Sequence, residues 1–383
     1  MKWNPQQFKI LGIWFTLDLR DLEKLNYDEK FNEVKILFKI WAQRMITPIG
    51  KVAVLKSLVL STLLHLWILL PDPPDKFITD LQMLCFQFIW NGKQDRISRK
   101  TVVKDTKQGG LNVPDVRNYI FALKLTWIRK FKSTGHKWKN VAVEMYPFLN
   151  DLEKRGASFV VERARNNLFW EHVFKAYKLI CKTVSPCSSR ELLAEPVLYN
   201  DNIKVGGKVI THTHLINKGI YCIKHFLTCN GEFLSHAAFN SKYNTNIDFL
   251  TFHSCVQSIR KYIRSTKIEV KDNFAFDLTV ALNLVHSVHK GTKVYYNALT
   301  QNDNYPNCCA KWSEKLNDQI PWKTVFFKIH KIGEVKLRWL QMRIVHRILA
   351  TNVMLEKMKV ATSIKCTFCC NEKDSIRHIF LGV

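Results

Sequence analysis

Apolar residues recur at three- and four-residue steps along most of this chain, and polar turns separate the runs. That spacing puts the apolar side chains on one face of an α-helix, whereas strict alternation would indicate a strand. The pattern therefore predicts a mainly α fold. The expected helical runs are Phe31 to Trp41, Val52 to Leu70, Lys76 to Trp90, Tyr119 to Phe131, Phe159 to Ile180, Phe249 to Ile263 and Phe274 to Val288.

The amino-terminal part adds one strand and a helical pair to this pattern. Phe8 to Ile13 is an apolar run, and we expect its strand to bend at Gly12. A turn from Thr47 to Lys51 joins two basic amphipathic helices, which predicts a helical hairpin. Further on, a basic loop leads into Gly109-Gly110, which we expect to be a turn and not a phosphate-binding loop.

The carboxyl-terminal part predicts more helix. Apolar residues after Trp322 fall into two amphipathic sets, so we expect two helices with a break near Gly333. Thr351 stands where the N-cap of a further short helix through Met358 would lie.

A cluster of metal-ligand residue types follows that helix. Cys366 and Cys369 have the spacing of a zinc knuckle, in which one tight turn lets two thiolates bind one Zn²⁺. His378 is close enough in the sequence to be a third ligand. Cys370 offers a rival spacing, so the pairing stays open, and the cysteines can equally be ordinary thiols. The candidate metal ligands are Cys366, Cys369 and His378.

Composition excludes several classes of protein. Apolar residues make up 47% of the 383, too many for a disordered chain, and the length suits two or three domains. The net charge of +26 favours nucleic acid as a partner, ahead of an anionic membrane surface.

The sequence also indicates the compartment. No secretory signal is evident and the eleven cysteines form no disulfide scaffold, so we expect reduced thiols and an intracellular protein, in the nucleus or the cytoplasm. Ser57 to Leu70, without Lys, Arg, Asp or Glu, is short for a membrane span, and no membrane association is expected.

Catalytic signatures are missing from the sequence. It contains no adjacent Asp-Asp pair to hold the two metal ions of a polymerase, and no nucleophile elbow, zinc-protease motif or Walker motif. We therefore expect no bound Mg²⁺ and no catalysis by this chain alone.

Several separated motifs resemble one family. They are Phe8-Lys9-Ile10-Leu11-Gly12, Trp41-x-x-Arg44, Phe88-Ile89-Trp90-Asn91-Gly92, Gly109-Gly110-Leu111-x-Val113-Pro114-Asp115, His346-Arg347-Ile348-Leu349 and the Cys-x2-Cys cluster. Together these motifs resemble the carboxyl-terminal part of LINE-type non-LTR retrotransposon reverse transcriptases. The resemblance implies three segments: residues 1–135 as the end of the palm with a thumb-like helical region, 136–315 as a helical connector, and 316–383 as the zinc-binding segment. In that family a fourth zinc ligand follows the histidine by five residues, where this chain has Val383.

The resemblance also implies a function. A carboxyl-terminal fragment of such an enzyme, without its palm carboxylates, would hold RNA or a template–primer duplex through the thumb and the zinc-binding tail. Lys and Arg bind phosphates by charge without reading sequence, although any one of them can equally be solvated surface charge. The candidate nucleic-acid contacts are Arg44, Lys51, Lys56, Arg96, Arg99 and Lys100. The alternative is a helical protein-interaction module with no nucleic-acid role.

Overall fold

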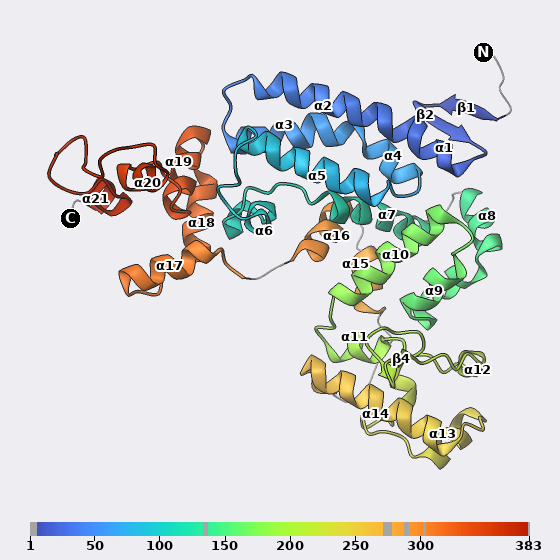
Figure 1. The fold of residues 1–383 in the computed structure, drawn as a ribbon. Helices are drawn as coiled ribbons and strands as arrows, with labels where there is room; N and C mark the ends of the chain where they lie inside the picture. Colours follow the sequence, from blue (N-terminus) through green and yellow to red (C-terminus); the bar gives the residue numbers. More distant parts are fainter. Residues whose placement is uncertain (1–5, 133–136, 271–277, 287–290, 302–303, 382–383) are drawn as a thin grey trace. The chain divides into compact units, whose positions relative to one another are not determined.

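The computed structural model describes residues 6–132, 137–270, 278–286, 291–301 and 304–381, and these are mainly helical, as predicted (Figure 1). Two compact units make up the chain: unit 1 combines residues 1–66, 73–116 and 302–383, and unit 2 combines residues 67–72 and 117–301. The three sequence segments inferred from the family resemblance stay a prediction. No helix within the described ranges has the length and the apolar character needed to cross a membrane.

Unit 1 begins with a β-hairpin, not with the single bent strand that the sequence predicted. Strands β1 (Gln7–Ile10) and β2 (Ile13–Thr16) pair antiparallel, with Ile10 opposite Ile13. Leu11 and Gly12 between them both have positive φ, 49° and 81°. Two central residues with positive φ form a tight hairpin turn whose twist matches that of the flanking strands. The chain therefore reverses direction at Leu11 and Gly12 and does not merely bend.

Helices cover the next part of unit 1. They are α1 (Leu19–Glu23), the π-helical turn η1 (Lys24–Asp28), α2 (Glu29–Ala42), α3 (Pro48–Val54), the π-helical turn η2 (Leu55–Val59), the 3₁₀ turn η3 (Leu60–Thr62) and α5 (Asp75–Trp90). Helix α4 (Leu64–Leu69) begins in unit 1, and its residues from Trp67 on belong to unit 2. The expected turn at Thr47 to Lys51 is instead the start of α3. Pro48 occupies its first position, and the Thr47 hydroxyl accepts a hydrogen bond from the Gly50 N–H at 3.2 Å, as an N-cap does.

The rest of unit 1 comes from both sides of unit 2 in the sequence. It contains α6 (Arg99–Val103), the 3₁₀ turn η4 (Thr106–Gln108), α17 (Asn307–Leu316), α18 (Trp322–Lys331), α19 (Val335–Val345), α20 (Asn352–Lys357) and α21 (Ile376–Leu381). The break near Gly333 is confirmed, since α18 ends and α19 begins on either side of it. The Thr351 cap is confirmed too, because its hydroxyl accepts from the Met354 N–H at 3.4 Å.

A shared core joins these late helices to the segment around α6. Its buried residues include Trp90, Leu111, Trp322, Phe326 and Ile329. Gly109, with φ +84°, lies directly under the ring of Phe326, and an added Cβ there would be only 2.5 Å from that ring. The glycine therefore serves both the turn and the close packing of η4 against α18.

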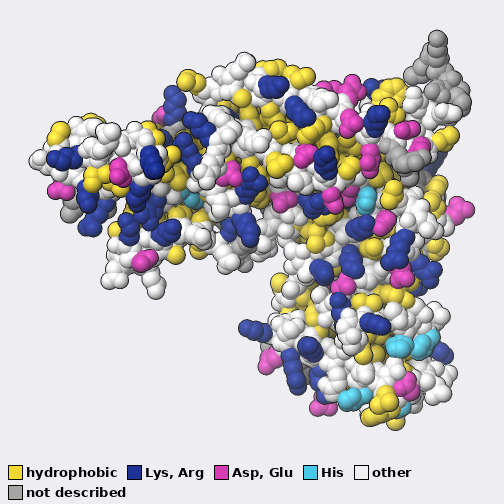
Figure 2. Space-filling view, in the orientation of Figure 1, with side chains coloured by type: hydrophobic (Ala, Val, Ile, Leu, Met, Phe, Trp, Pro, Cys, Tyr) yellow, Lys and Arg dark blue, Asp and Glu magenta, His cyan; other side chains and the backbone are white. Residues whose placement is uncertain are grey.

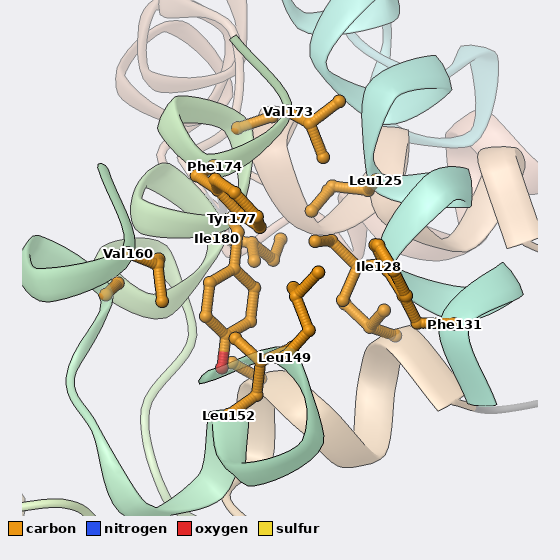
Figure 3. Packing of buried hydrophobic residues seen from close by; sticks show 14 of the residues in the cluster. Leu125, Ile128, Phe131, Leu149, Leu152, Val160, Val173, Phe174, Tyr177 and Ile180 are labelled. Atoms are coloured by element: carbon orange, nitrogen blue, oxygen red, sulfur yellow. The ribbon is translucent and has the colours of Figure 1, made fainter. Parts of the chain in front are cut away.

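Unit 2 has two cores of its own. The first is built from α7 (Val116–Lys132), α8 (Lys137–Met145), η5 (Pro147–Lys154), α9 (Ala157–Arg163), α10 (Leu168–Thr183), α15 (Val280–His286) and α16 (Gly291–Thr300). Figure 3 shows Phe174 and Tyr177 of α10 facing Leu125 and Ile128 of α7 across it. Residues 274–277 and 287–288 of the expected run from Phe274 to Val288 lie outside the described residues.

The second core of unit 2 lies among α11 (Ser189–Ala194), η6 (Ile223–Phe226), α13 (His236–Tyr243) and α14 (Phe249–Thr266). Strands β3 (Lys204–Val205) and β4 (Lys208–Val209) and helix α12 (His214–Asn217) complete this part. Phe226, Phe239 and Phe252 are all buried there. These aromatic rings stack closely, with Phe226 and Phe239 centroids 5.0 Å apart.

Gly109→Ala tests the packing that joins the parts of unit 1. We expect it to lower the free energy of unfolding by about 2 kcal/mol or more, because a side chain must adopt positive φ and also displace the buried Phe326 ring. Gly92→Ala is the matched control, since Gly92 also has positive φ (70°) but nothing lies within 4 Å of its added Cβ. Urea unfolding measures both variants. Equal losses would mean that the Phe326 contact adds nothing.

Candidate functional site

The carboxyl-terminal cysteines lie in a short hairpin-like loop, here called the knuckle turn (residues 365–373). Lys365 and Lys373 form an isolated antiparallel bridge, and the Cys366 N–H donates to the Glu372 carbonyl at 2.8 Å. Inside the loop, the Cys370 N–H donates to the Cys366 carbonyl at 2.9 Å. These bonds close a tight turn, which places the thiols of Cys366 and Cys369 on the same side.

Helix α21 brings a histidine to this turn. The side-chain donor atoms of Cys366, Cys369 and His378 all lie within 4.8 Å of one another. The Cys369 Sγ and the His378 Nε2 are 3.3 Å apart. Zinc–sulfur and zinc–nitrogen bonds of about 2.3 and 2.0 Å need ligand atoms at roughly such separations. Two thiols and an imidazole here therefore fit one metal ion.

The structure decides between the two cysteine spacings. Cys370 has a left-handed backbone, with φ 58°, and it is not among the three residues whose donor atoms converge. Its place in the turn is one that glycine usually takes, because a Cβ is unfavourable at positive φ. Cys369 is thus the partner of Cys366 and His378. Val383, where the family resemblance implies a fourth ligand, lies outside the described residues.

Neighbouring groups hold the knuckle turn in place. The buried Asp374 carboxylate accepts a hydrogen bond from the Asn352 N–H at 2.6 Å, and the Asn352 side chain donates to the Lys365 carbonyl at 2.7 Å. Both ends of the turn are therefore tied to the start of α20. The Ser375 hydroxyl accepts from the His378 N–H at 3.2 Å, which fixes the first turn of α21.

Backbone N–H groups also prepare the Cys369 sulfur to bind a metal. Hydrogen bonds from the backbone of Glu372 and of Asn371, with smaller effects of Cys366 and His378, lower the pKa of the Cys369 thiol to about 7. Each of these contacts stabilises the thiolate more than the thiol. Since the thiolate is the form that coordinates metals, the turn favours the binding state of the residue.

Lys51 corrects the predicted set of nucleic-acid contacts. Its side chain is only 1% exposed, and its ammonium donates to the Phe88 carbonyl at 2.8 Å and to the Asn91 side-chain oxygen. Burial lowers the pKa of this ammonium. Lys51 is therefore a buried cap on the carboxyl end of α5 and does not present its charge to a phosphate in this structure.

The other predicted basic residues lie at the surface. Arg44 and Lys56 are exposed, and the Arg44 guanidinium stacks over the Trp41 ring with its carbon 4.5 Å from the centroid. Arg96 and Lys100 are exposed near α6. Arg99 is exposed as well, but its guanidinium pairs with Asp95 at 2.7 Å, which reduces its availability. Phosphate binding by these five residues stays a prediction.

The structure adds a surface hollow that sequence reasoning missed. It has a volume of about 580 Å³, and Lys107 and Gln108 of the α6–η4 segment line it together with Lys323 and Phe327 of α18 and with Tyr305. Lys107 belongs to the basic loop that leads into Gly109-Gly110. Lys323, Phe327 and Lys331 stand at four-residue steps on one helix, and that pattern was the available signal.

A thiol–imidazole pair lies next to the Gly109 turn. The Cys308 Sγ is 3.5 Å from the His346 Nδ1, and the His346 Nε2 is 2.8 Å from the Gly109 carbonyl oxygen. Because a carbonyl only accepts, Nε2 carries the proton and Nδ1 faces the sulfur as an acceptor. A hydrogen bond from the Cys309 thiol lowers the pKa of Cys308, and burial of the sulfur opposes this effect. Cys308 is buried and His346 is half-buried, and the pair ties α17 and the end of α19 to the Gly109 turn.

No protein-family model matches the chain.

Cys369→Ser tests the metal ligands against a matched neighbour. We expect it to weaken metal binding by more than about tenfold, because even residues outside the ligand shell cost that much when altered. Cys370→Ser makes the same atomic change one residue later and should leave affinity within about twofold. Competition for Zn²⁺ with a chromogenic chelator measures both. A larger loss in Cys370→Ser would reverse the assignment.

Lys51→Glu and Lys56→Glu separate a buried lysine from an exposed one. Lys51→Glu should lower the free energy of unfolding by about 3 kcal/mol or more, since it buries a carboxylate against two oxygen acceptors. Lys56→Glu on the neighbouring turn should change it by less than about 0.5 kcal/mol. Urea denaturation followed by circular dichroism provides the comparison. Similar stability of the two variants would contradict the buried role of Lys51.

Proposed function

We propose that this chain binds nucleic acid through unit 1, as the carboxyl-terminal part of a LINE-type reverse transcriptase would. The observation that carries the proposal is the packing of η4 against α18. It brings Lys107 and Lys323, which are far apart in the sequence, to the walls of one hollow. Lysines gathered at one place attract a polyanion more strongly than the same number spread over the surface.

Two further lysines extend this surface, and we call the four together the basic face: Lys104, Lys107, Lys323 and Lys331. The Lys104 ammonium donates to the carbonyl of Asn304, which lines the hollow. The Lys331 ammonium lies 4.7 Å from the centroid of the Phe327 ring. Figure 2 shows Lys and Arg side chains gathered over the carboxyl-terminal helices of unit 1.

Charge composition supports the same assignment. Residues 304–383 contain fourteen Lys and Arg against six Asp and Glu. One nearby carboxylate, that of Asp105, is used internally, because it accepts a hydrogen bond from the Lys107 N–H at 2.8 Å. Phosphate contacts by such lysines would be largely independent of sequence.

The metal in the proposal is zinc. Soft thiolate ligands combined with imidazole favour Zn²⁺ over the hard cations Mg²⁺ and Ca²⁺. Its role would be structural, because the knuckle turn is tied to α20 and a bound ion would join both to α21. Template, primer or element RNA would be the ligand of the basic face. The resemblance of the separated motifs supports this origin.

Charge reversal at the basic face tests the proposal. The triple variant Lys107→Glu, Lys323→Glu and Lys331→Glu should weaken binding of a labelled oligonucleotide by more than about tenfold at low salt. It should also flatten the dependence of log K on log salt, because each lost phosphate contact removes about 0.7 to 0.9 from the slope. Fluorescence anisotropy across a salt series measures both quantities.

Two other triple variants serve as comparisons. Lys208→Glu, Lys218→Glu and Lys261→Glu reverse three exposed lysines of unit 2 and should weaken binding far less. Arg44→Glu, Lys56→Glu and Lys100→Glu test the surface predicted from the sequence, without the buried Lys51. Equal losses from the basic-face and unit 2 variants would contradict a localised site. Absence of binding by the parent chain would favour the protein-interaction alternative.

A further inference from the structure

The hollow of unit 1 has a composition that charge alone does not explain. Besides Lys107 and Lys323, it is lined by two aromatic side chains that are large and solvent-accessible: Tyr305 is 46% exposed and Phe327 is 42% exposed. A volume of about 580 Å³ lies within the ordinary range of ligand sites, roughly 300 to 1,000 Å³. Exposed rings gathered around one hollow indicate that an apolar surface binds there.

Both rings are held by their neighbours. Tyr305 stacks on Phe326, with centroids 6.5 Å apart and an interplanar angle of 22°, and Phe326 is fully buried over Gly109. The Lys331 ammonium lies over Phe327. Because the ring beneath Tyr305 belongs to the core, the orientation of the tyrosine is set before a ligand arrives. Such preorganisation lowers the entropy cost of binding.

The polar groups around the rings indicate which apolar ligand fits. Among the described residues, none of those that line the hollow is acidic, and the two lysines accompany the amide side chains of Gln108 and Asn304. Flat aromatic surfaces beside cations and amides suit a planar ring attached to a phosphate. An unpaired nucleotide has this combination, whereas the apolar face of a protein helix would leave both lysines without an anionic partner.

We propose that this hollow binds an unpaired base of single-stranded nucleic acid, which stacks on Tyr305 or Phe327 while Lys107 and Lys323 contact the flanking phosphates. The inference rests on the proposed function and narrows its ligand to a single strand. In a duplex the faces of the bases are covered by their own neighbours, so only an unpaired base offers a free face to these rings.

The test compares one oligonucleotide as a single strand, as a duplex and as a single strand with several abasic positions. The parent chain should bind the abasic strand about tenfold or more weakly than the intact strand, since stacking contributes strongly for each base while the phosphate charge is unchanged. The double variant Tyr305→Ala and Phe327→Ala should lose about the same factor on the intact strand. It should lose nothing further on the abasic strand, and duplex binding should stay within about twofold.

Phe249→Ala is the matched control, because Phe249 is 59% exposed on α14 of unit 2 and should not affect binding of any of the three ligands. The abasic comparison uses the parent chain alone, so it holds even if the double variant folds poorly. Equal binding of intact and abasic strands by the parent chain would overturn the stacking site and leave nucleic-acid binding by charge intact. In that case an apolar protein partner would be the occupant of the rings. No binding of any oligonucleotide at low salt would overturn both proposals.

Discussion

The contact between Phe326 and Gly109 is the constraint on which the rest of unit 1 depends. A glycine with positive φ leaves room for a buried ring, and that ring fixes η4 against α18. The His346 imidazole adds a hydrogen bond to the same junction through the Gly109 carbonyl. Segments more than two hundred residues apart in the sequence thus form one core. This packing places the basic loop beside the lysines of α18 and so creates the hollow that both of them line.

The lysines that give the chain its positive charge differ in burial: some are exposed at the surface, and others are buried inside the protein. Lys51 is buried as a helix cap in unit 1, and Lys124 is buried in unit 2, where its ammonium donates to the Leu70 carbonyl and lies 3.7 Å from Asp72. Burial lowers the pKa of Lys124 to about 8, an effect that Asp72 opposes. Such residues stabilise helix ends and contribute little to an outer field. Buried lysines therefore have to be left out of the net charge before that charge is used to argue for a polyanionic ligand.

Local sequence pattern predicted the parts of the structure that depend on neighbours in the chain. The helical period, the break at Gly333 and the Thr351 cap each involve residues within a few positions of one another, and all are present. Cys366, Cys369 and His378 were also found from their spacing, because a tight turn and a short helix bring them together. What the pattern could not predict was long-range. The Phe88 carbonyl that accepts from the buried Lys51 ammonium lies thirty-seven residues away, and the glycine under Phe326 is far from that ring in the sequence.

The choice between Cys369 and Cys370 explains why spacing alone was insufficient at the metal site. Both residues are near enough in the sequence to reach His378, and both are exposed. They differ in backbone conformation, since the turn closes through the Cys370 N–H and forces that residue to a φ of 58°. A residue in that conformation directs its side chain differently from its neighbour, so only one thiol can join Cys366. The turn that makes a knuckle possible therefore also selects, through its backbone hydrogen bonds, which thiol could hold a metal ion together with Cys366 and His378.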